Sequence, residues 1–306
     1  MILSINPTYY CNFRCNFCYL TEQQLSDQTT LPVPILEQRI QEAQQYHEVT
    51  MVDLYGGEIG LLSEEYVVDL CDMLHRNGID DINIVTNLSM VNQVIRNPDL
   101  YITVSYDFDC REQHERVWNN MFQLGKPFSI LVLAGPDLLK KNVDEMIMQL
   151  NLLQNLNSVE IKPYSTNQAN CHPVTNKDFE EFVQQWIESP VNKNFQFINE
   201  SNIKTVLDGT RNAFSNDHIY ITPTGDFAVL EFDLNDREYF KRLDSIEDYN
   251  SWAEQEPVKN VSNICKECSY YGKCLTEHYR YVTDLDSSCN GYKHLIDWYK
   301  NEIKQS

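Results

Sequence analysis

The sequence predicts an α/β fold, a partial TIM-like barrel of six β/α units in residues 1–200 followed by a smaller extension in residues 201–306. Short apolar segments alternate with amphipathic segments of helical period along the first part of the chain, which is typical of parallel strands joined by helices. Six such units fall short of the eight that close a barrel. After about residue 200 the alternation stops, which indicates a change of architecture.

The expected strands are short and apolar and end at glycine, proline or polar residues. They cover 2–7, 51–55, 82–86, 100–105, 128–133 and 159–163. The expected helices begin near capping or proline residues and repeat apolar side chains at helical spacing. They cover 33–46, 63–75, 91–96, 112–122, 136–153 and 175–188. In a barrel, the polar residues that follow the strands should meet at one end and line the active site.

The extension begins with a predicted β-hairpin. Two apolar segments, 218–222 and 227–232, flank a Pro-Thr-Gly-Asp turn sequence. Short helices are expected at 246–254 and 292–303, with a cysteine-rich segment between them. We therefore expect residues 201–306 to form a second, smaller domain.

The composition argues against several classes of partner. The chain of 306 residues has 24 basic and 45 acidic side chains, a net charge of −21. A chain this acidic lacks the electrostatic footprint that binds nucleic-acid phosphates or anionic membrane surfaces. It shows no signal peptide and no apolar run of membrane-spanning length. Ten cysteines at metal-ligand spacings then predict a protein of the reducing cytoplasm rather than a disulfide-bonded secreted one.

The most informative motif is a run of three cysteines directly after the first strand. Cys11, Cys15 and Cys18 have the spacing C-x3-C-x2-C. Three thiolates this close can face one cubic iron–sulfur cluster and leave its fourth iron without a protein ligand. An open coordination position distinguishes a catalytic metal centre from a structural one. A zinc knuckle is the alternative interpretation of such a short cysteine segment.

This spacing, with Phe17 just before the third cysteine, resembles the radical S-adenosylmethionine (SAM) superfamily. The resemblance implies a partial barrel and a [4Fe–4S] cluster whose open iron is chelated by SAM. It also implies one-electron cleavage of SAM to a 5′-deoxyadenosyl radical, with the electron supplied by a donor such as flavodoxin or ferredoxin. In the family, the residue at the position of Phe17 packs near the adenine.

The second strand ends in Gly56, Gly57 and Glu58. This segment resembles the GGE segment of the family, which receives the SAM amino group. Glycines at such a place let a ligand approach the backbone closely. A proline usually follows in the family, whereas this chain has Ile59. An ordinary turn between strand and loop is the alternative.

Polar residues also end the third and fourth strands, and we expect them to contact SAM. The third strand ends in Thr86 and Asn87, and the fourth in Ser105 and Asp107. The stretch from Ser105 to Arg116 resembles a segment of peptide-modifying members in which a serine and an arginine hold the SAM carboxylate. The spacing differs by about one residue from the family pattern, and a solvated helix arginine is the alternative for Arg116.

A second cysteine group lies near the C-terminus. Cys265, Cys268, Cys274 and Cys289 offer four soft ligands, enough for a zinc site or a second iron–sulfur cluster. The order C-x2-C-x5-C with a later cysteine is similar to the SPASM/Twitch extension of radical SAM enzymes, which implies an auxiliary [4Fe–4S] cluster. His278 stands where full SPASM domains have a further cysteine, so we expect one auxiliary cluster, not two.

Three cysteines remain. Cys71 lies on an apolar helix face and is expected in the core. Cys110 and Cys171 follow the fourth and sixth strands, where a thiol at the active-site rim can return a hydrogen atom to a substrate radical. His172 beside Cys171 is a candidate base. The alternative is that both thiols are bystanders.

The resemblance implies an oxidoreductase that modifies a ribosomally made peptide, with a C–C or thioether cross-link as the expected product. Two other enzymatic hypotheses stay open: a dehydrogenase of a small molecule, and a peptide epimerase that uses Cys110 or Cys171 as hydrogen donor. Alanine in place of each thiol would separate the epimerase, which should lose net inversion but still cleave SAM. A non-catalytic metal-binding module would not cleave SAM at all.

Overall fold

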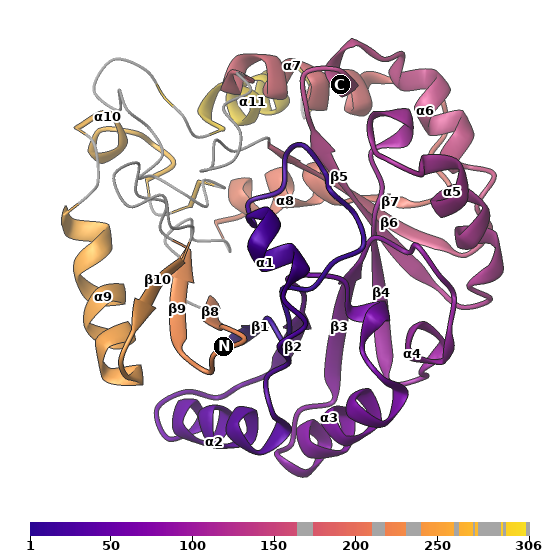
Figure 1. The fold of residues 1–306 in the computed structure, drawn as a ribbon. Helices are drawn as coiled ribbons and strands as arrows, with labels where there is room; N and C mark the ends of the chain where they lie inside the picture. The colour runs from indigo at the N-terminus through magenta and orange to yellow at the C-terminus, as the bar shows by residue number, and fades with distance from the viewer. Residues whose placement is uncertain are drawn as a thin grey trace.

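The computed structural model describes residues 1–163, 174–209, 218–230, 240–259, 263–271, 273–274, 289 and 292–303. Its strands form one sheet in the order β10-β9-β8-β1-β2-β3-β4-β5-β6-β7. Strands β1 to β6 are parallel and follow one another in chain order, and α2 to α6 lie outside them (Figure 1). The predicted partial β/α barrel is therefore confirmed.

Six barrel strands coincide with the apolar segments of the sequence: β1 (Ile2–Ile5), β2 (Met51–Leu54), β3 (Asp81–Thr86), β4 (Leu100–Ser105), β5 (Phe128–Ala134) and β6 (Leu156–Pro163). A seventh, β7 (Gln196–Phe197), was not expected from the sequence. The later strands are β8 (His218–Ile221), β9 (Phe227–Leu230) and β10 (Phe240–Leu243). The predicted hairpin is present, because β8 and β9 pair antiparallel.

The helices that cover the barrel are amphipathic and begin at capping residues in most cases. They are α1 (Glu22–Ser26), α2 (Val33–Gln44), α3 (Glu64–Arg76), α4 (Gln93–Arg96), α5 (His114–Gln123), α6 (Val143–Leu150), α7 (Asn176–Glu188) and α8 (Ile198–Leu207). The remaining helices are α9 (Ile246–Lys259), α10 (Asn263–Lys266) and α11 (Lys293–Trp298), which continues into a π-helical turn, Tyr299–Ile303.

The expected single helix at 136–153 is two elements. A 3-10 turn, Leu138–Lys140, precedes α6. The Asn142 side chain caps α6 by accepting hydrogen bonds from two backbone N–H groups of its first turn, at 2.9 and 3.3 Å. A capping asparagine has extended backbone dihedrals, so a helix cannot run through it. The helical period alone did not reveal this break.

The two faces of the sheet differ in polarity. Apolar residues such as Leu3, Val52 and Ile84 face the helices and are fully buried. Alternate positions at the middle of β2, β3 and β4 are polar: Asn83 Nδ2 donates to Asp53 Oδ1 at 3.0 Å, and Thr103 Oγ1 donates to Asn83 Oδ1 at 3.1 Å. The interior of a closed barrel is filled by branched apolar side chains. The open barrel instead carries this polar cluster on the concave face of three strands.

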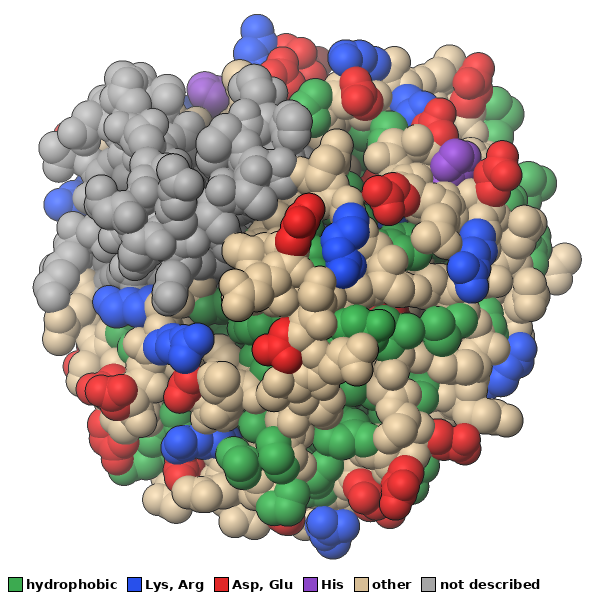
Figure 2. Space-filling model, in the orientation of Figure 1, with side chains coloured by type: hydrophobic (Ala, Val, Ile, Leu, Met, Phe, Trp, Pro, Cys, Tyr) green, Lys and Arg blue, Asp and Glu red, His purple; other side chains and the backbone are tan. Residues whose placement is uncertain are grey.

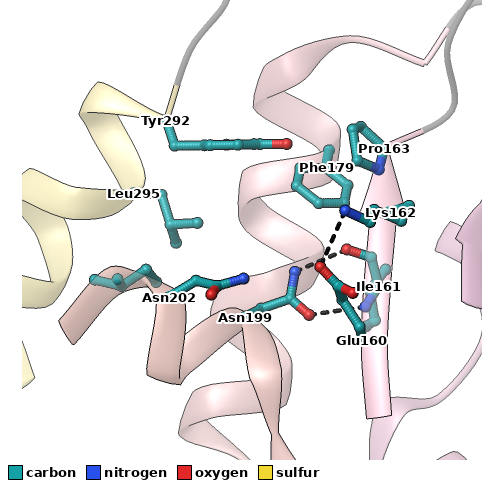
Figure 3. A pocket seen from close by; sticks show the side chains of 10 residues that line it. Glu160, Ile161, Lys162, Pro163, Phe179, Asn199, Asn202, Tyr292 and Leu295 are labelled. Carbon is teal, nitrogen blue, oxygen red and sulfur yellow. Dashed lines mark hydrogen bonds and ion pairs between the residues drawn. The ribbon is translucent and has the colours of Figure 1, made fainter. Parts of the chain in front are cut away.

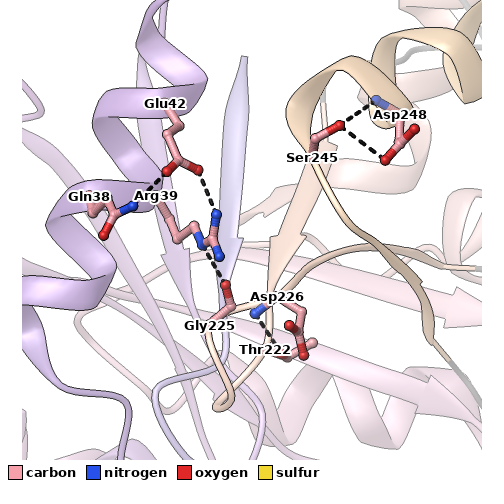
Figure 4. Close-up of polar contacts among 8 residues, drawn as sticks. All are labelled: Gln38, Arg39, Glu42, Thr222, Gly225, Asp226, Ser245 and Asp248. Atoms are coloured by element: carbon pink, nitrogen blue, oxygen red, sulfur yellow. Dashed lines mark hydrogen bonds and ion pairs between the residues drawn. The ribbon is translucent and has the colours of Figure 1, made fainter.

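The extension continues the barrel sheet. Strand β8 pairs parallel with β1, opposite β2. The hairpin turn also docks on α2: Arg39 Nε donates to the Gly225 carbonyl at 2.7 Å, and its guanidinium carbon lies 5.4 Å from the centre of the Phe227 ring (Figure 4). Glu42 pairs with Arg39 at 2.6 Å. These contacts join the regions on either side of residue 200, and the division into two domains stays a prediction.

The surface shows no single dominant charge on the face in view. Acidic and basic side chains are interspersed there (Figure 2). None of the helices in the described part of the chain is both long and apolar enough to span a bilayer.

A buried carboxylate joins the barrel to the last helix. Glu180 on α7 is 4% exposed, and its Oε1 accepts a hydrogen bond from the backbone N–H of Leu295 in α11 at 3.2 Å. Burial raises the pKa of Glu180 from 4.5 to about 7. The folded chain therefore binds this proton more tightly than the unfolded chain, so the free energy of unfolding falls as pH rises from about 4.5 to about 7.

We expect Glu180→Gln to stabilise the protein at pH 8 by about 1–3 kcal/mol, because it keeps the hydrogen-bond acceptor and removes the buried charge. At pH 4.5 the carboxyl is protonated in the folded protein, so the gain should vanish. Urea unfolding at both pH values measures this. Glu188→Gln, an exposed change on the same helix, should shift stability by less than about 0.5 kcal/mol at either pH. An equal gain at both pH values would contradict the assignment.

Candidate functional site

The three N-terminal cysteines lie on the loop of residues 8–20 that follows β1, here called the cysteine loop. Phe13 anchors it in the core and is 1% exposed. The backbone N–H of Cys11 donates to the Leu25 carbonyl at 3.1 Å, and that of Cys18 donates to the Cys15 carbonyl at 3.0 Å. All three thiols are half-buried and free of disulfides. Local turns and one core anchor thus hold the three thiols at the carboxyl end of β1.

The surroundings of these thiols suit a cationic partner. Burial raises the pKa of Cys11, Cys15 and Cys18, that of Cys15 to about 12. Left alone, each thiol would stay protonated at neutral pH. A bound metal centre removes such protons, because its positive charge stabilises the thiolate. The backbone N–H of Phe13 also donates to Cys11 Sγ at 3.4 Å, a contact typical of sulfur ligands of clusters.

The donor set of the cysteine loop is three thiols, the ligand type that iron–sulfur clusters take. Among the residues that the structure describes, no three His, Cys, Asp or Glu side chains converge on a point that could hold one metal ion. A cubic cluster has a different requirement, because each cysteine binds a separate iron at its own corner. Three half-buried thiols on one short loop, with a backbone donor to sulfur, meet that requirement. Cys11, Cys15 and Cys18 would hold the cluster.

The glycine turn after β2 packs directly under the cysteine loop. Gly57 N donates to the Thr8 carbonyl at 3.0 Å, and Glu58 N donates to the Tyr10 carbonyl at 2.8 Å. A Cβ atom on Gly57 would lie 2.1 Å from the Tyr10 carbonyl oxygen, well inside van der Waals contact. Gly56 has φ +133°, a conformation that L side chains rarely adopt. Both glycines are therefore needed for the two loops to meet.

The Glu58 carboxylate ties β2 to β3. It is 1% exposed and accepts hydrogen bonds from Thr86 Oγ1 at 2.5 Å, from Gly60 N at 2.8 Å and from Asn87 N at 2.7 Å. Burial raises its pKa, although the three donors oppose that effect. The carboxylate oxygens are thus engaged inside the protein. Its contribution to a SAM site would be to fix the backbone of this turn and the position of Asn87.

Asn87 connects the end of β3 to the cysteine loop. Its Nδ2 donates to Asn12 Oδ1 at 3.0 Å and lies 3.6 Å from Cys11 Sγ. Its Oδ1 accepts a hydrogen bond from Ser89 N at 2.8 Å, which fixes the amide. The structure thus brings Asn87, predicted from its place at a strand end, to the first cysteine. Asn12 was not predicted, and only its position inside the cysteine motif hints at this contact.

An arginine that the sequence did not single out lies beside the cysteine loop. The Arg111 Nε donates to Asp107 Oδ2 at 2.8 Å, and its Nη2 lies 2.7 Å from the same oxygen. Its guanidinium carbon is 5.0 Å from the centre of the Phe17 ring. Asp107 Oδ1 accepts a further hydrogen bond from Leu133 N at 2.7 Å. The predicted residues Phe17 and Asp107 are thus brought together, with Arg111 between them.

Arg116 lies elsewhere. It is exposed on α5, and its Nη1 donates to Gln113 Oε1 at 3.2 Å. The resemblance to a family segment pointed to Arg116, whereas the structure places Arg111 against the site. Gln113, with φ +54°, separates the loop that carries Arg111 from α5. A signal for Arg111 was present in the sequence: a basic residue four positions after an aspartate at a strand end.

Of the two candidate hydrogen donors, Cys110 and Cys171, the structure describes only Cys110. Cys110 follows β4 and is half-buried, and burial raises its pKa to about 11. At neutral pH it therefore stays a thiol, the form that can give a hydrogen atom. Ser105, the last residue of β4, is half-buried on the concave face, in register with Leu131. Cys171 and His172 lie outside the described residues.

A pocket lies beside the carboxyl end of β6, between α7, α8 and α11 (Figure 3). An ion pair of 3.1 Å between Lys162 and Glu160 lies on its wall. The Asn199 side chain bonds both the N–H and the carbonyl of Ile161, at 2.8 and 2.7 Å. The strand edge is therefore satisfied at that position, and a ligand here would meet side chains rather than backbone.

The second cysteine group is described only in part. Cys268 N donates to the Cys265 carbonyl at 3.1 Å, and Cys274 is 9% exposed. The pKa of Lys293 is raised, mainly by its hydrogen bond to Asp297, with smaller contributions from Cys268 and Cys289. Residues 275–288, with His278, lie outside the described residues, and an auxiliary cluster stays a prediction.

Comparison with known proteins identifies the fold. No family model and no curated protein matches the sequence. The structure of native anSMEcpe with bound AdoMet matches with a TM-score of 0.71 and 13% identity, covering 99% of this chain and 98% of that one. Streptococcus suis SuiB bound to S-adenosylmethionine matches with a TM-score of 0.63 and 15% identity, covering 90% of this chain and 72% of SuiB.

SuiB bound to its precursor peptide SuiA gives a TM-score of 0.61 at 16% identity, over 90% of this chain and 70% of SuiB. These neighbours are radical SAM enzymes. The likeness extends over the barrel and most of the extension, as the coverage of this chain shows. The chain has the fold of the radical SAM enzymes.

Proposed function

We propose that this protein is a radical SAM enzyme that acts on a ribosomally made peptide. The observation that carries the proposal is the packing of the cysteine loop on the glycine turn, with the Tyr10 carbonyl closing over Gly57. When bound, the cluster would supply one electron to SAM, and the 5′-deoxyadenosyl radical so formed would take a hydrogen atom from the substrate. The residues of the chain have five tasks around it.

Cys11, Cys15 and Cys18 hold three of the irons. The Arg111 guanidinium binds the SAM carboxylate, since it is the buried cation beside the loop and guanidinium matches carboxylate geometry. The backbone at Gly56 and Gly57 receives the SAM amino group. Thr86, Asn87 and Glu58 keep that turn and the cysteine loop in one arrangement. Phe17 and Ser105 flank the bound cofactor.

A peptide substrate is supported by two observations. SuiB, which shares the fold, has been solved with a precursor peptide. The concave face of the barrel carries a polar cluster, with the Asp53, Asn83 and Thr103 side chains hydrogen-bonded across three strands, and it can serve the amide groups of a peptide. The proposed product is a C–C or thioether cross-link, with an auxiliary [4Fe–4S] cluster at the second cysteine group accepting the second electron.

Anaerobic reconstitution with iron and sulfide tests the proposal. We expect about eight irons per chain and formation of 5′-deoxyadenosine from SAM in the wild type. The triple variant Cys11/Cys15/Cys18→Ala should hold about four irons and form none. About four irons in the wild type, with zinc and retained cleavage, would support the barrel site and remove the auxiliary cluster.

Failure of the loaded wild type to cleave SAM, with and without a peptide encoded beside it, would overturn the enzymatic proposal. Loss of two hydrogen atoms from such a peptide, measured by mass spectrometry, is the result expected for a cross-link. A small molecule oxidised in its place would favour the dehydrogenase.

A further inference from the structure

Arg111 is a buried cation held against one side of the cysteine loop. Its side chain is 9% exposed. Two contacts to Asp107, of 2.7 and 2.8 Å, fix the guanidinium from one direction. The guanidinium carbon also lies 5.0 Å from the centre of the ring of Phe17, the residue directly before Cys18 in the sequence. The positive charge therefore has a set position against the cysteine loop before any ligand binds.

In the ion pair between Arg111 and Asp107, it is Arg111 that contacts the cysteine loop. The Arg111 guanidinium lies over the Phe17 ring of the cysteine loop, whereas Asp107 holds the guanidinium through Oδ2, at 2.7 and 2.8 Å. The Asp107 carboxylate is turned toward Arg111 and the Leu133 N–H. The pair thus acts as an oriented dipole rather than as a neutral unit.

We propose that Arg111 sets the reduction potential of the cluster held by Cys11, Cys15 and Cys18. One-electron reduction would add a negative charge to the cluster, and a fixed cation beside the cysteine loop would stabilise that charge. Nearby charge and solvent exposure are among the factors that tune cluster potentials. This inference rests on the proposed function, because it requires a cluster on the cysteine loop.

The step needs no proton. One electron passes from a mediator reduced by dithionite to the oxidised cluster, and the mediator is oxidised by one electron. Arg111 stays protonated throughout, because guanidinium does not lose its proton in proteins. Its neighbour Asp107 raises its pKa further. The field on the cluster is therefore the same before and after reduction.

The test is an anaerobic redox titration of the reconstituted protein without SAM, followed by electron paramagnetic resonance. Arg111→Gln should make reduction about tenfold less favourable, a fall of about 59 mV for one electron. Arg111→Lys keeps the charge and should recover at least half of that shift. Asp107→Asn removes the opposing charge and should move the potential upward. Arg116→Gln makes the same change at an exposed position and should leave the potential unchanged.

The inference predicts shifts of the reduction potential in opposite directions for Arg111→Gln and Asp107→Asn, so it can be refuted. Clusters that load fully in all variants but titrate at one potential would overturn it and leave the proposed function intact. A fall in potential for both Arg111→Gln and Arg111→Lys would also overturn it, because charge would then not be the cause. If Arg111→Gln does not fold, the reduction potentials of the other two variants still test the inference. Asp107→Asn should titrate at a higher potential than the wild type, and Arg111→Lys should not. Absence of a cluster from the wild type would instead contradict the proposed function.

Discussion

Gly57→Ala is expected to abolish SAM cleavage, with a loss of at least about 100-fold. The new methyl group would lie 2.1 Å from the Tyr10 carbonyl oxygen and 2.6 Å from the Tyr9 carbonyl carbon. Both are backbone atoms directly before Cys11, so the cysteine loop itself must move. The hydrogen bonds from Gly57 N and Glu58 N to this loop would be lost with it. We expect unfolding to become easier by about 2–4 kcal/mol.

Iron content, 5′-deoxyadenosine formation and urea unfolding together measure this effect. Gly78→Ala is the matched control. It also costs stability, because Gly78 has φ +76°, but its Cβ would meet nothing within 4 Å and it lies at the end of α3, away from the cysteine loop. We expect it to keep its cluster and its cleavage rate. A Gly57→Ala protein with wild-type iron content and cleavage would show that the close approach of the loops is dispensable.

Glu58→Gln is expected to destabilise the protein by about 2–4 kcal/mol, although it removes a buried charge. Both carboxylate oxygens accept hydrogen bonds: Oε1 from Thr86 and Gly60, and Oε2 from Asn87 N. An amide has only one acceptor oxygen, so its NH2 group would face an N–H donor. At least one buried donor then loses its partner. Because Asn87 also contacts Cys11 and Asn12, SAM affinity should fall together with stability.

Thermal or urea unfolding of the metal-free chain gives the stability term, and equilibrium dialysis with labelled SAM gives the affinity after reconstitution. Glu65→Gln makes the same chemical change at an exposed position in the first turn of α3 and should stay within about 0.5 kcal/mol of the wild type. A stabilised Glu58→Gln protein would mean that the cost of the buried charge exceeds the value of its three hydrogen bonds.

The strand and helix pattern was readable because it is local. The period of apolar residues and the capping residues predicted β1 to β6 and the helices between them, and the structure confirms that fold class. The prediction was less complete where short elements depend on distant partners. Strand β7 has two residues and pairs only with Ser158 and Val159, so its apolar pattern is too short to detect. Helix α1 has only five residues and begins with a capping box at Thr21, so it is too short for an apolar period to indicate it.

The spacing of the three cysteines could be read from the sequence because it, too, is a local feature. Three ligands within eight residues have to lie close together whatever the rest of the chain does. The residues that surround the cysteines could not be identified in this way, because they come from distant parts of the sequence. Arg111 and Arg116 are separated by little sequence, and both follow β4. In the folded chain Arg111 lies against Phe17 and is held by Asp107, whereas Arg116, beyond the left-handed turn at Gln113, is on the surface.

By itself the sequence determined the order of strands and helices in the barrel and the identity of the loop that offers three thiols. Only the tertiary structure decided that β8 pairs with β1, that the Glu58 oxygens accept hydrogen bonds from Thr86 and Asn87, and that Arg111 lies against Phe17. Periodicity and ligand spacing express the geometry of a few neighbouring residues. Hydrogen bonds and ion pairs between segments depend instead on which strands lie side by side and how closely their loops pack, and these are properties of the folded chain.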